Sequence, residues 1–201
     1  MSTTHKGYKI TDHYATYFLT FTVVGWIDLF TRPACKAIVV EALKYAQIHK
    51  GLVIYAYVIM GSHIHIVAAA SDPEHPLYNI IGAFKSYTSK QLVQWVTDNP
   101  KESRRHWLLH LFKYYATNNK RNTTYQIWRQ DNQPKRCLYP GFTMQKIDYT
   151  HNNPVIEGIV EAPIAYLHSS AGQYAGLHSD ILKVEVLDFG TQIGHVHVLA
   201  P

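Results

Sequence analysis

One stretch in the first half of the chain decides the fold, Ile54-Tyr55-Ala56-Tyr57-Val58-Ile59-Met60-Gly61-Ser62-His63-Ile64-His65-Ile66-Val67-Ala68. Its β-branched and aromatic residues favour strands, and Gly61-Ser62 interrupts them, so the sequence predicts a hairpin of strands 52–59 and 63–70. Because side chains at positions i and i+2 of a strand share a face, His63 and His65 should lie side by side, with Ile64 and Ile66 packed into a core behind them. Two neighbouring imidazoles can supply two ligands to a divalent metal.

The segments on either side of this hairpin predict a mixed α+β order. Residues 14–24 are rich in Thr, Tyr, Phe and Val and suit a strand. Apolar residues recur at helical spacing in two long segments, and Gly51 stops the first of them. The predicted helices span 34–50, 77–98 and 142–153, with a short helix near 107–112, a strand at 125–129 and a short strand at 181–187. The resulting order indicates an antiparallel sheet with helices packed on it, related to the ferredoxin-like split βαβ arrangement, with the histidine strand inside the sheet.

Composition is that of a single folded domain. Of the 201 residues, 47% are hydrophobic and 16% are charged, which is typical of a protein with a substantial core and not of a disordered chain. No apolar run reaches the ~18–20 residues that a membrane helix needs, and the N-terminus lacks a signal-peptide segment. We therefore expect a soluble cytoplasmic protein with no membrane partner. The two cysteines lie far apart without CxxC spacing, which argues against a disulfide framework or a thiolate zinc site.

Positive charge is concentrated in one part of the chain. The formal net charge is +5, and nine of the 19 Lys and Arg residues lie between residues 101 and 136, where aromatic residues are interleaved with them. Cations for phosphates and flat rings for unstacked bases are what single-stranded nucleic acid needs. The alternative is a solvated charged face over an ordinary aromatic core. The candidate DNA contacts are Lys85, Arg104, Arg105, Lys113, Lys120, Arg121, Trp128, Arg129, Lys135 and Arg136.

The predicted helix at 142–153 carries the second chemical signal. Tyr149 and Asn153 are four residues apart and so lie one above the other on one helical face. A tyrosine hydroxyl is a poor nucleophile unless it is activated, and a divalent metal that polarises a scissile phosphate lowers that demand. An Asn carbonyl can be the third ligand beside two imidazoles, a set that suits Mg²⁺ or Mn²⁺. Each residue alone is typical of a structural role, and Asn153 before Pro154 could simply end a helix.

Together these motifs resemble a known family. His63-Ile64-His65 resembles the His-hydrophobic-His motif of the HUH endonucleases, and Tyr149-Thr150-His151-Asn152-Asn153-Pro154-Val155 resembles the tyrosine helix of their single-tyrosine transposases. The combination is most similar to the REP-associated tyrosine transposases, relatives of the insertion-sequence-200 type. Further segments follow in the family's order: Ile127-Trp128-Arg129-Gln130, Gly158-Ile159-Val160, and Tyr166-Leu167-His168-Ser169-Ser170-Ala171 with Tyr174.

The resemblance spans residues 14 to 187, and the chain departs from the family pattern at two places. It implies a single HUH transposase domain at 1–187 and a C-terminal tail at 188–201. Gly61-Ser62 stands where relatives often have Pro-Asn, and Ile156 stands where many have a basic residue. The tail holds a second His-x-His pair, His195 and His197, which we interpret as a terminal strand or a flexible end.

What the resemblance implies is a ferredoxin-like or RRM-like HUH endonuclease fold and a metal-dependent single-stranded DNA endonuclease and strand transferase. Tyr149 would attack a phosphodiester to give a 5′-phosphotyrosine, while His63, His65 and Asn153 would hold Mg²⁺ or Mn²⁺. The partner would be single-stranded or hairpin DNA, bound by a homodimer or a monomer.

Three alternatives stay open at this stage. The first is a domesticated DNA-binding protein that keeps the fold but does not transpose. The second is a hydrolase or small-molecule metalloprotein that uses His63 and His65. The third is a relaxase or rolling-circle initiator. It is disfavoured because relaxases usually place the tyrosine before the histidines and initiators usually pair it with a nearby Lys.

Overall fold

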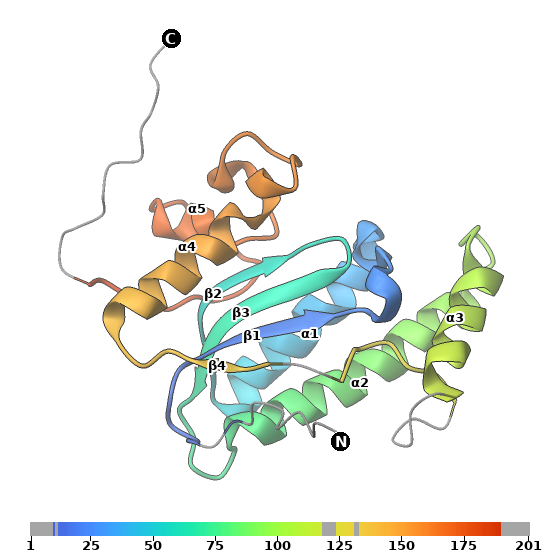
Figure 1. Cartoon of the computed structure of the whole chain (residues 1–201), viewed down its shortest axis with the longest axis horizontal. Helices are drawn as coiled ribbons and strands as arrows, with labels where there is room; N and C mark the ends of the chain where they lie inside the picture. Colours follow the sequence, from blue (N-terminus) through green and yellow to red (C-terminus); the bar gives the residue numbers. More distant parts are fainter. Residues whose placement is uncertain (1–9, 11, 118–123, 131–132, 190–201) are drawn as a thin grey trace, which may run out of the picture.

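The sheet of this protein has four antiparallel strands in the order β2-β3-β1-β4. A computed structural model describes residues 10, 12–117, 124–130 and 133–189. The strands are β1 (Tyr17–Thr22), β2 (Leu52–Ile59), β3 (His63–Ala70) and β4 (Lys135–Arg136). The hairpin of β2 and β3 has the predicted bounds, and β3 lies inside the sheet between β2 and β1 (Figure 1).

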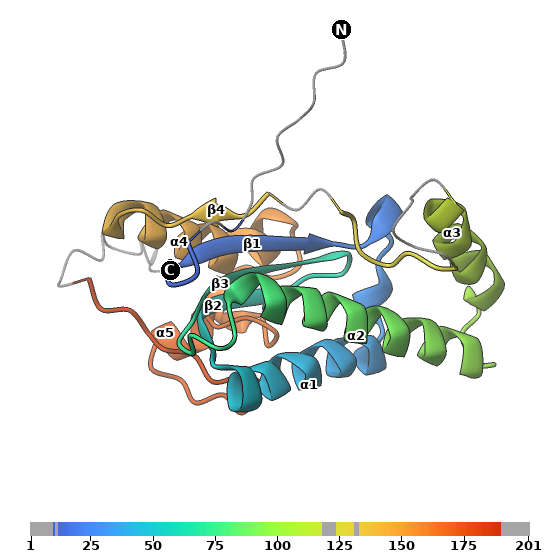
Figure 2. The ribbon, with the colours of Figure 1, turned by 90° about the horizontal axis from the view of Figure 1, so that it is seen from below.

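Helices cover both faces of this sheet. α1 (Pro33–Lys50) and α2 (Leu77–Asp98) pack together on one face, and α4 (Pro140–Ile156) lies on the other (Figure 2). α3 (Arg105–Thr117) follows α2, and the short α5 (Ala171–Tyr174) lies near α4. The predicted α+β class, with helices on an antiparallel sheet, is confirmed. No helix in the described part of the chain is long and apolar enough to cross a membrane.

Strand alternation decides which side chains meet which helix layer. On β3, Ile64 and Ile66 belong to the large core beneath α1 and α2. Their neighbour Val67 belongs instead to a smaller cluster with Phe18 of β1 and Ile147 of α4. The period of two therefore places His63 and His65 on the α4 side of the sheet, as the sequence predicts.

Two predicted strands are wrong. Residues 125–129 form no strand, because Gln126 donates its backbone N–H to Phe112 of α3 and only Trp128 makes an isolated bridge, to Val23. The fourth strand is β4 instead. Residues 181–187 also form no strand, although the backbone N–H of Glu185 donates to Ile54 at 2.9 Å.

Other elements differ from prediction in their bounds. β1 is shorter than 14–24, because the chain turns into a 3-10 helix, η1 (Val24–Trp26), where Gly25 has φ 62°. α3 is longer than 107–112. α4 continues past the predicted end at Asn153, because Pro154 is accommodated and Gly158, at φ 68°, supplies the left-handed residue just beyond the last turn.

Candidate active site

His63 and His65 stand side by side on the sheet under α4. Their ring centroids are 4.8 Å apart, and each residue is 5% exposed. The Nδ1 atom of His65 lies 2.9 Å from Thr20 Oγ1, and that of His63 lies 3.2 Å from Ser62 Oγ. Because a neighbour engages Nδ1 in both rings, Nε2 is the nitrogen oriented for a ligand.

Tyr149 lies against this pair from α4. Its ring is edge-on to His65 at 5.2 Å and edge-on to Phe18 at 5.8 Å, while Phe18 stacks on His65 at 5.2 Å. The ring is thus held by two aromatic neighbours, yet 43% of the residue remains exposed. One turn earlier, the Lys146 ammonium lies 5.7 Å from the Tyr149 ring centroid. A nucleophile needs this combination of fixed orientation and open access.

Asn153 links the tyrosine helix to the histidines. It is 6% exposed, donates from Nδ2 to the Tyr149 carbonyl at 3.3 Å, and places Oδ1 3.3 Å from His63 Nε2. Glu157, a further turn along, brings a carboxylate oxygen to 3.9 Å from the same nitrogen and is half-exposed. Tyr149, Asn153 and Glu157 therefore form one stripe of α4 and its end, facing β3.

Burial keeps both imidazoles in the neutral form that binds metals. It lowers the pKa of His65 to about 3, and the nearby His63 and Lys146 act in the same direction. Burial also lowers the pKa of His63, against the opposing effects of Asn153 and Glu157. Since a protonated imidazole cannot coordinate a cation, both rings are ready to bind one at neutral pH.

The donor set fits a divalent cation only when Asn153 is counted. Within the described ranges, no three His, Cys, Asp or Glu side chains are grouped so as to hold a metal ion. His63, His65 and the Asn153 carbonyl oxygen supply two nitrogens and one oxygen, all buried, with Nδ1 of each ring already oriented. Such a set leaves coordination positions for phosphate oxygens or water, as Mg²⁺ and Mn²⁺ require.

The predicted DNA contacts divide between core, ion pairs and surface. Trp128 is a correction, because it is 3% exposed, stacks on Phe30 and donates its indole N–H to Thr88, so no base can reach its ring. Lys85 is held by the Arg129 carbonyl at 2.8 Å. Arg104 is paired with Asp28 and Glu102.

The remaining predicted cations differ in how far they are exposed. Lys113, Lys135 and Arg136 are exposed, although Arg136 pairs with Asp12, and Arg105 is half-buried. Arg129 lines a hollow beside η1. The predicted contacts Lys120 and Arg121, and the tail histidines His195 and His197, lie outside the described residues.

Sequence reasoning missed three neighbours of the site. Thr20 faces His65 across the β1–β3 ladder, and Phe18 lies two residues before it on the same face, so strand pairing was needed to find both. Lys146 is different, because its i, i+3 spacing to Tyr149 was readable in the sequence.

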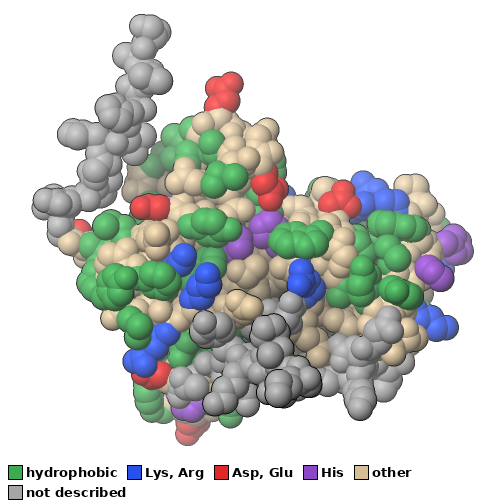
Figure 3. All heavy atoms as spheres, viewed as in Figure 1, with side chains coloured by type: hydrophobic (Ala, Val, Ile, Leu, Met, Phe, Trp, Pro, Cys, Tyr) green, Lys and Arg blue, Asp and Glu red, His purple; other side chains and the backbone are tan. Residues whose placement is uncertain are grey.

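Figure 3 shows histidine side chains at the bottom of a hollow on this face, with Lys and Arg on both flanks and acidic side chains along its upper edge.

Comparisons with known proteins show which solved structures this protein is similar to. The sequence matches no protein-family model and no curated protein. The α+β fold that the sequence motifs predict is similar to that of a solved transposase structure. One similar solved structure is that of a REP-associated tyrosine transposase bound to a REP hairpin, with 16% identity and a TM-score of 0.58 over 96% of this chain and 99% of that one. A crystal structure described as a transposase of Deinococcus radiodurans R1 aligns at 14% identity and a TM-score of 0.41, over 75% of this chain and 95% of that one.

Proposed function

We propose that this protein is a metal-dependent transesterase of single-stranded DNA, of the REP-associated tyrosine transposase type, with Tyr149 as its nucleophile. The observation that supports it most is the seating of α4 on β3. One helix brings a half-exposed tyrosine to 5.2 Å from the His65 ring, and four residues later brings an asparagine oxygen to 3.3 Å from His63. Residues 90 positions apart in sequence thus form one composite site.

In the proposed reaction, the Tyr149 hydroxyl loses its proton and its oxygen attacks the phosphorus of a DNA phosphodiester. The bond from phosphorus to the 3′-oxygen breaks, and that oxygen takes up one proton from solvent, in balance with the proton that the tyrosine releases to solvent. This leaves a free 3′-OH on one strand and a 5′-phosphotyrosine on the protein. Attack by a 3′-OH on that linkage reverses the step, so joining needs no nucleotide cofactor. A divalent cation held by His63, His65 and Asn153 would polarise the phosphate.

Lys146 would assist this step by electrostatics. Its ammonium lies 5.5 Å from the Phe18 ring centroid and 5.7 Å from that of Tyr149, on the exposed side of the site. A fixed positive charge there favours the negative charge that develops on the reacting phosphate. The exposed cations on β4, Lys135 and Arg136, would add phosphate contacts for the strand outside the site.

The direct test is to trap the covalent intermediate. The full chain is incubated with a hairpin-bearing single-stranded oligonucleotide and Mg²⁺ or Mn²⁺, and adducts are resolved on a denaturing gel. We expect an adduct that Tyr149→Phe abolishes without loss of DNA binding. The exposed Tyr139, just before α4, supplies the control, and Tyr139→Phe should keep the adduct. An adduct that persists in Tyr149→Phe would overturn the assignment. Binding with no adduct in the wild type would instead support a DNA-binding protein that does not cleave.

A further inference from the structure

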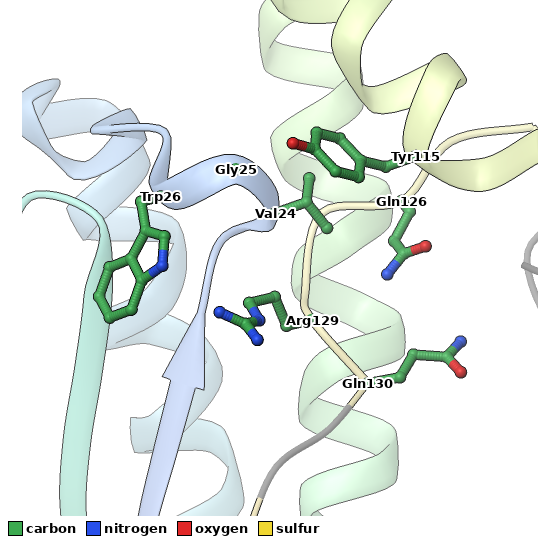
Figure 4. Close-up of a pocket in the computed structure, with 7 residues that line it drawn as sticks. All are labelled: Val24, Gly25, Trp26, Tyr115, Gln126, Arg129 and Gln130. Carbon is green, nitrogen blue, oxygen red and sulfur yellow. The ribbon is translucent and has the colours of Figure 1, made fainter. Parts of the chain in front are cut away.

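A solvent-open hollow of about 430 Å³ lies next to the candidate active site (Figure 4). It is bounded by η1, by Tyr115 of α3 and by the segment 126–130. Its volume is within the range of ordinary ligand sites, and both polar and aromatic side chains line it. We call it the Trp26 hollow, after the residue that joins it to the active site.

Trp26 presents a large apolar ring to solvent beside His63. The residue is 57% exposed, and its ring lies edge-on to His63 at a centroid distance of 5.5 Å. Its φ is 55°, in the left-handed region, and among the described non-glycine residues it alone has a positive φ. Such a conformation is strained for a residue with a side chain, and conformations of this kind concentrate at functional sites.

The turn that carries Trp26, η1, is held in place by two other segments of the chain. Gly25 also has a positive φ, and Tyr115 Oη lies 2.9 Å from where a Cβ on residue 25 would be. The backbone of Val24 is in turn bonded to Ile127, through its N–H, at 2.8 Å. Two separate elements therefore hold η1 in the shape that presents the indole.

The third wall supplies polar groups. Arg129 is anchored through its backbone N–H to Thr22 at 2.8 Å, and in Figure 4 its guanidinium extends toward the indole of Trp26. The amide side chains of Gln126 and Gln130 lie along the same segment. Gln126 is buried and donates from Nε2 to the Trp128 carbonyl at 3.0 Å, whereas Gln130 is exposed. A flat exposed ring, a cation and the Gln130 amide together form a surface that can stack a base and contact its phosphate.

We propose that the Trp26 hollow binds one unstacked nucleotide of single-stranded DNA next to the scissile phosphate, with its base stacked on Trp26 and its phosphate near Arg129. This proposal rests on the proposed DNA function and names a subsite for the strand beside the candidate metal ligand His63. The 5.5 Å contact between Trp26 and His63 places the nucleotide in the hollow beside a candidate metal ligand.

The test separates base stacking from charge. Two fluorescein-labelled oligonucleotides of about 12 nucleotides are compared, one of thymidine and one with every base removed. For each protein variant, the ratio of the abasic Kd to the thymidine Kd measures how much the bases contribute. We expect Trp26→Ala to lower this ratio by at least about fivefold, the size of one stacked base. Trp26→Phe, which keeps a ring, should retain most of it.

Trp107 provides the matched control. It is 50% exposed on α3 but does not line the hollow, so Trp107→Ala should leave the ratio unchanged. Thermal unfolding of all variants shows whether the exposed substitutions leave the fold intact. Equal ratios in Trp26→Ala and Trp107→Ala would overturn the proposal.

Failure of the subsite can be told apart from failure of the reaction. If the Tyr149 adduct forms but Trp26→Ala behaves like Trp107→Ala, the hollow is not the subsite and the reaction stands. If no adduct forms but the ratio falls in Trp26→Ala alone, the hollow binds single-stranded DNA in a protein that does not cleave. If the wild type binds neither oligonucleotide, both proposals fail.

Discussion

At the residue scale, the hydrogen bond between Thr20 and His65 orients a candidate metal ligand. Thr20 Oγ1 lies 2.9 Å from His65 Nδ1, so the ring is fixed with Nε2 oriented for a ligand. We expect Thr20→Val, which keeps the shape but removes the hydroxyl, to weaken Mn²⁺ binding about 10-fold or more. Loss of the hydrogen-bond partner of a metal-binding histidine has an effect of this size in other metalloproteins. Isothermal titration with Mn²⁺ measures this directly.

Thr22 is the matched control for that substitution. It lies two residues further along β1 on the same face, opposite His63, whose Nδ1 is already engaged by Ser62. Thr22→Val should therefore leave Mn²⁺ affinity within about twofold of the wild type. Equal weakening in both variants would mean that strand packing, not the hydroxyl on His65, is responsible.

At the element scale, the contact between η1 and α3 shapes the Trp26 hollow. We expect Gly25→Ala to destabilise the protein on two grounds, since residue 25 has φ 62° and its new Cβ would lie 2.9 Å from Tyr115 Oη. Gly158→Ala is the control, because Gly158 has φ 68° but nothing within 4 Å of a Cβ. Urea unfolding should show a loss of about 1–2 kcal/mol for Gly158→Ala and a larger loss for Gly25→Ala. Similar losses would show that Tyr115 yields without cost.

Elements whose pattern is local could be predicted from the sequence. The β2–β3 hairpin and α2 have the expected bounds, because alternation and helical periodicity each report on neighbouring residues alone. The segment 125–129 reads equally well as a strand, but its backbone bonds go to α3 and β1 one at a time. Nothing within five residues specifies those distant partners.

The same division holds within the site. His63 with His65, and Tyr149 with Asn153, follow from the periods of a strand and a helix, so their faces could be predicted. Their approach to one another depends on how α4 seats on the sheet, and only the likeness to a family anticipated it. Trp26 gave no signal in the sequence, because its exposure depends on a turn whose conformation two distant segments impose.

At the scale of the whole molecule, three histidines are buried where α4 packs against the rest of the protein. Two of them lie on the sheet, and the third lies on α4 and faces Ser170. His63, His65 and His151 are all buried, and burial lowers the pKa of all three, to about 3 for His65 and to about 4 for His151. This region holds the candidate site, so its response to pH is a property of the site and of the fold together.

These shifts predict that acid destabilises the fold well before the carboxylates titrate. Above the ordinary histidine pKa of about 6.5, neither state binds the protons. As pH falls below that pKa, the unfolded chain binds protons on these histidines and the folded chain does not. The free energy of unfolding therefore decreases by up to about 1.4 kcal/mol per pH unit for each of these histidines. For His151 the loss should continue down to about pH 4 and then level off.

Urea unfolding in EDTA between about pH 7 and 4.5 measures how steeply the free energy of unfolding falls with pH. His151→Gln, which can still bond Ser170, should reduce this slope by about one proton, whereas substitution of the exposed His110 should not. An unchanged slope in His151→Gln would mean that this ring takes up its proton in the folded state as readily as in the unfolded chain.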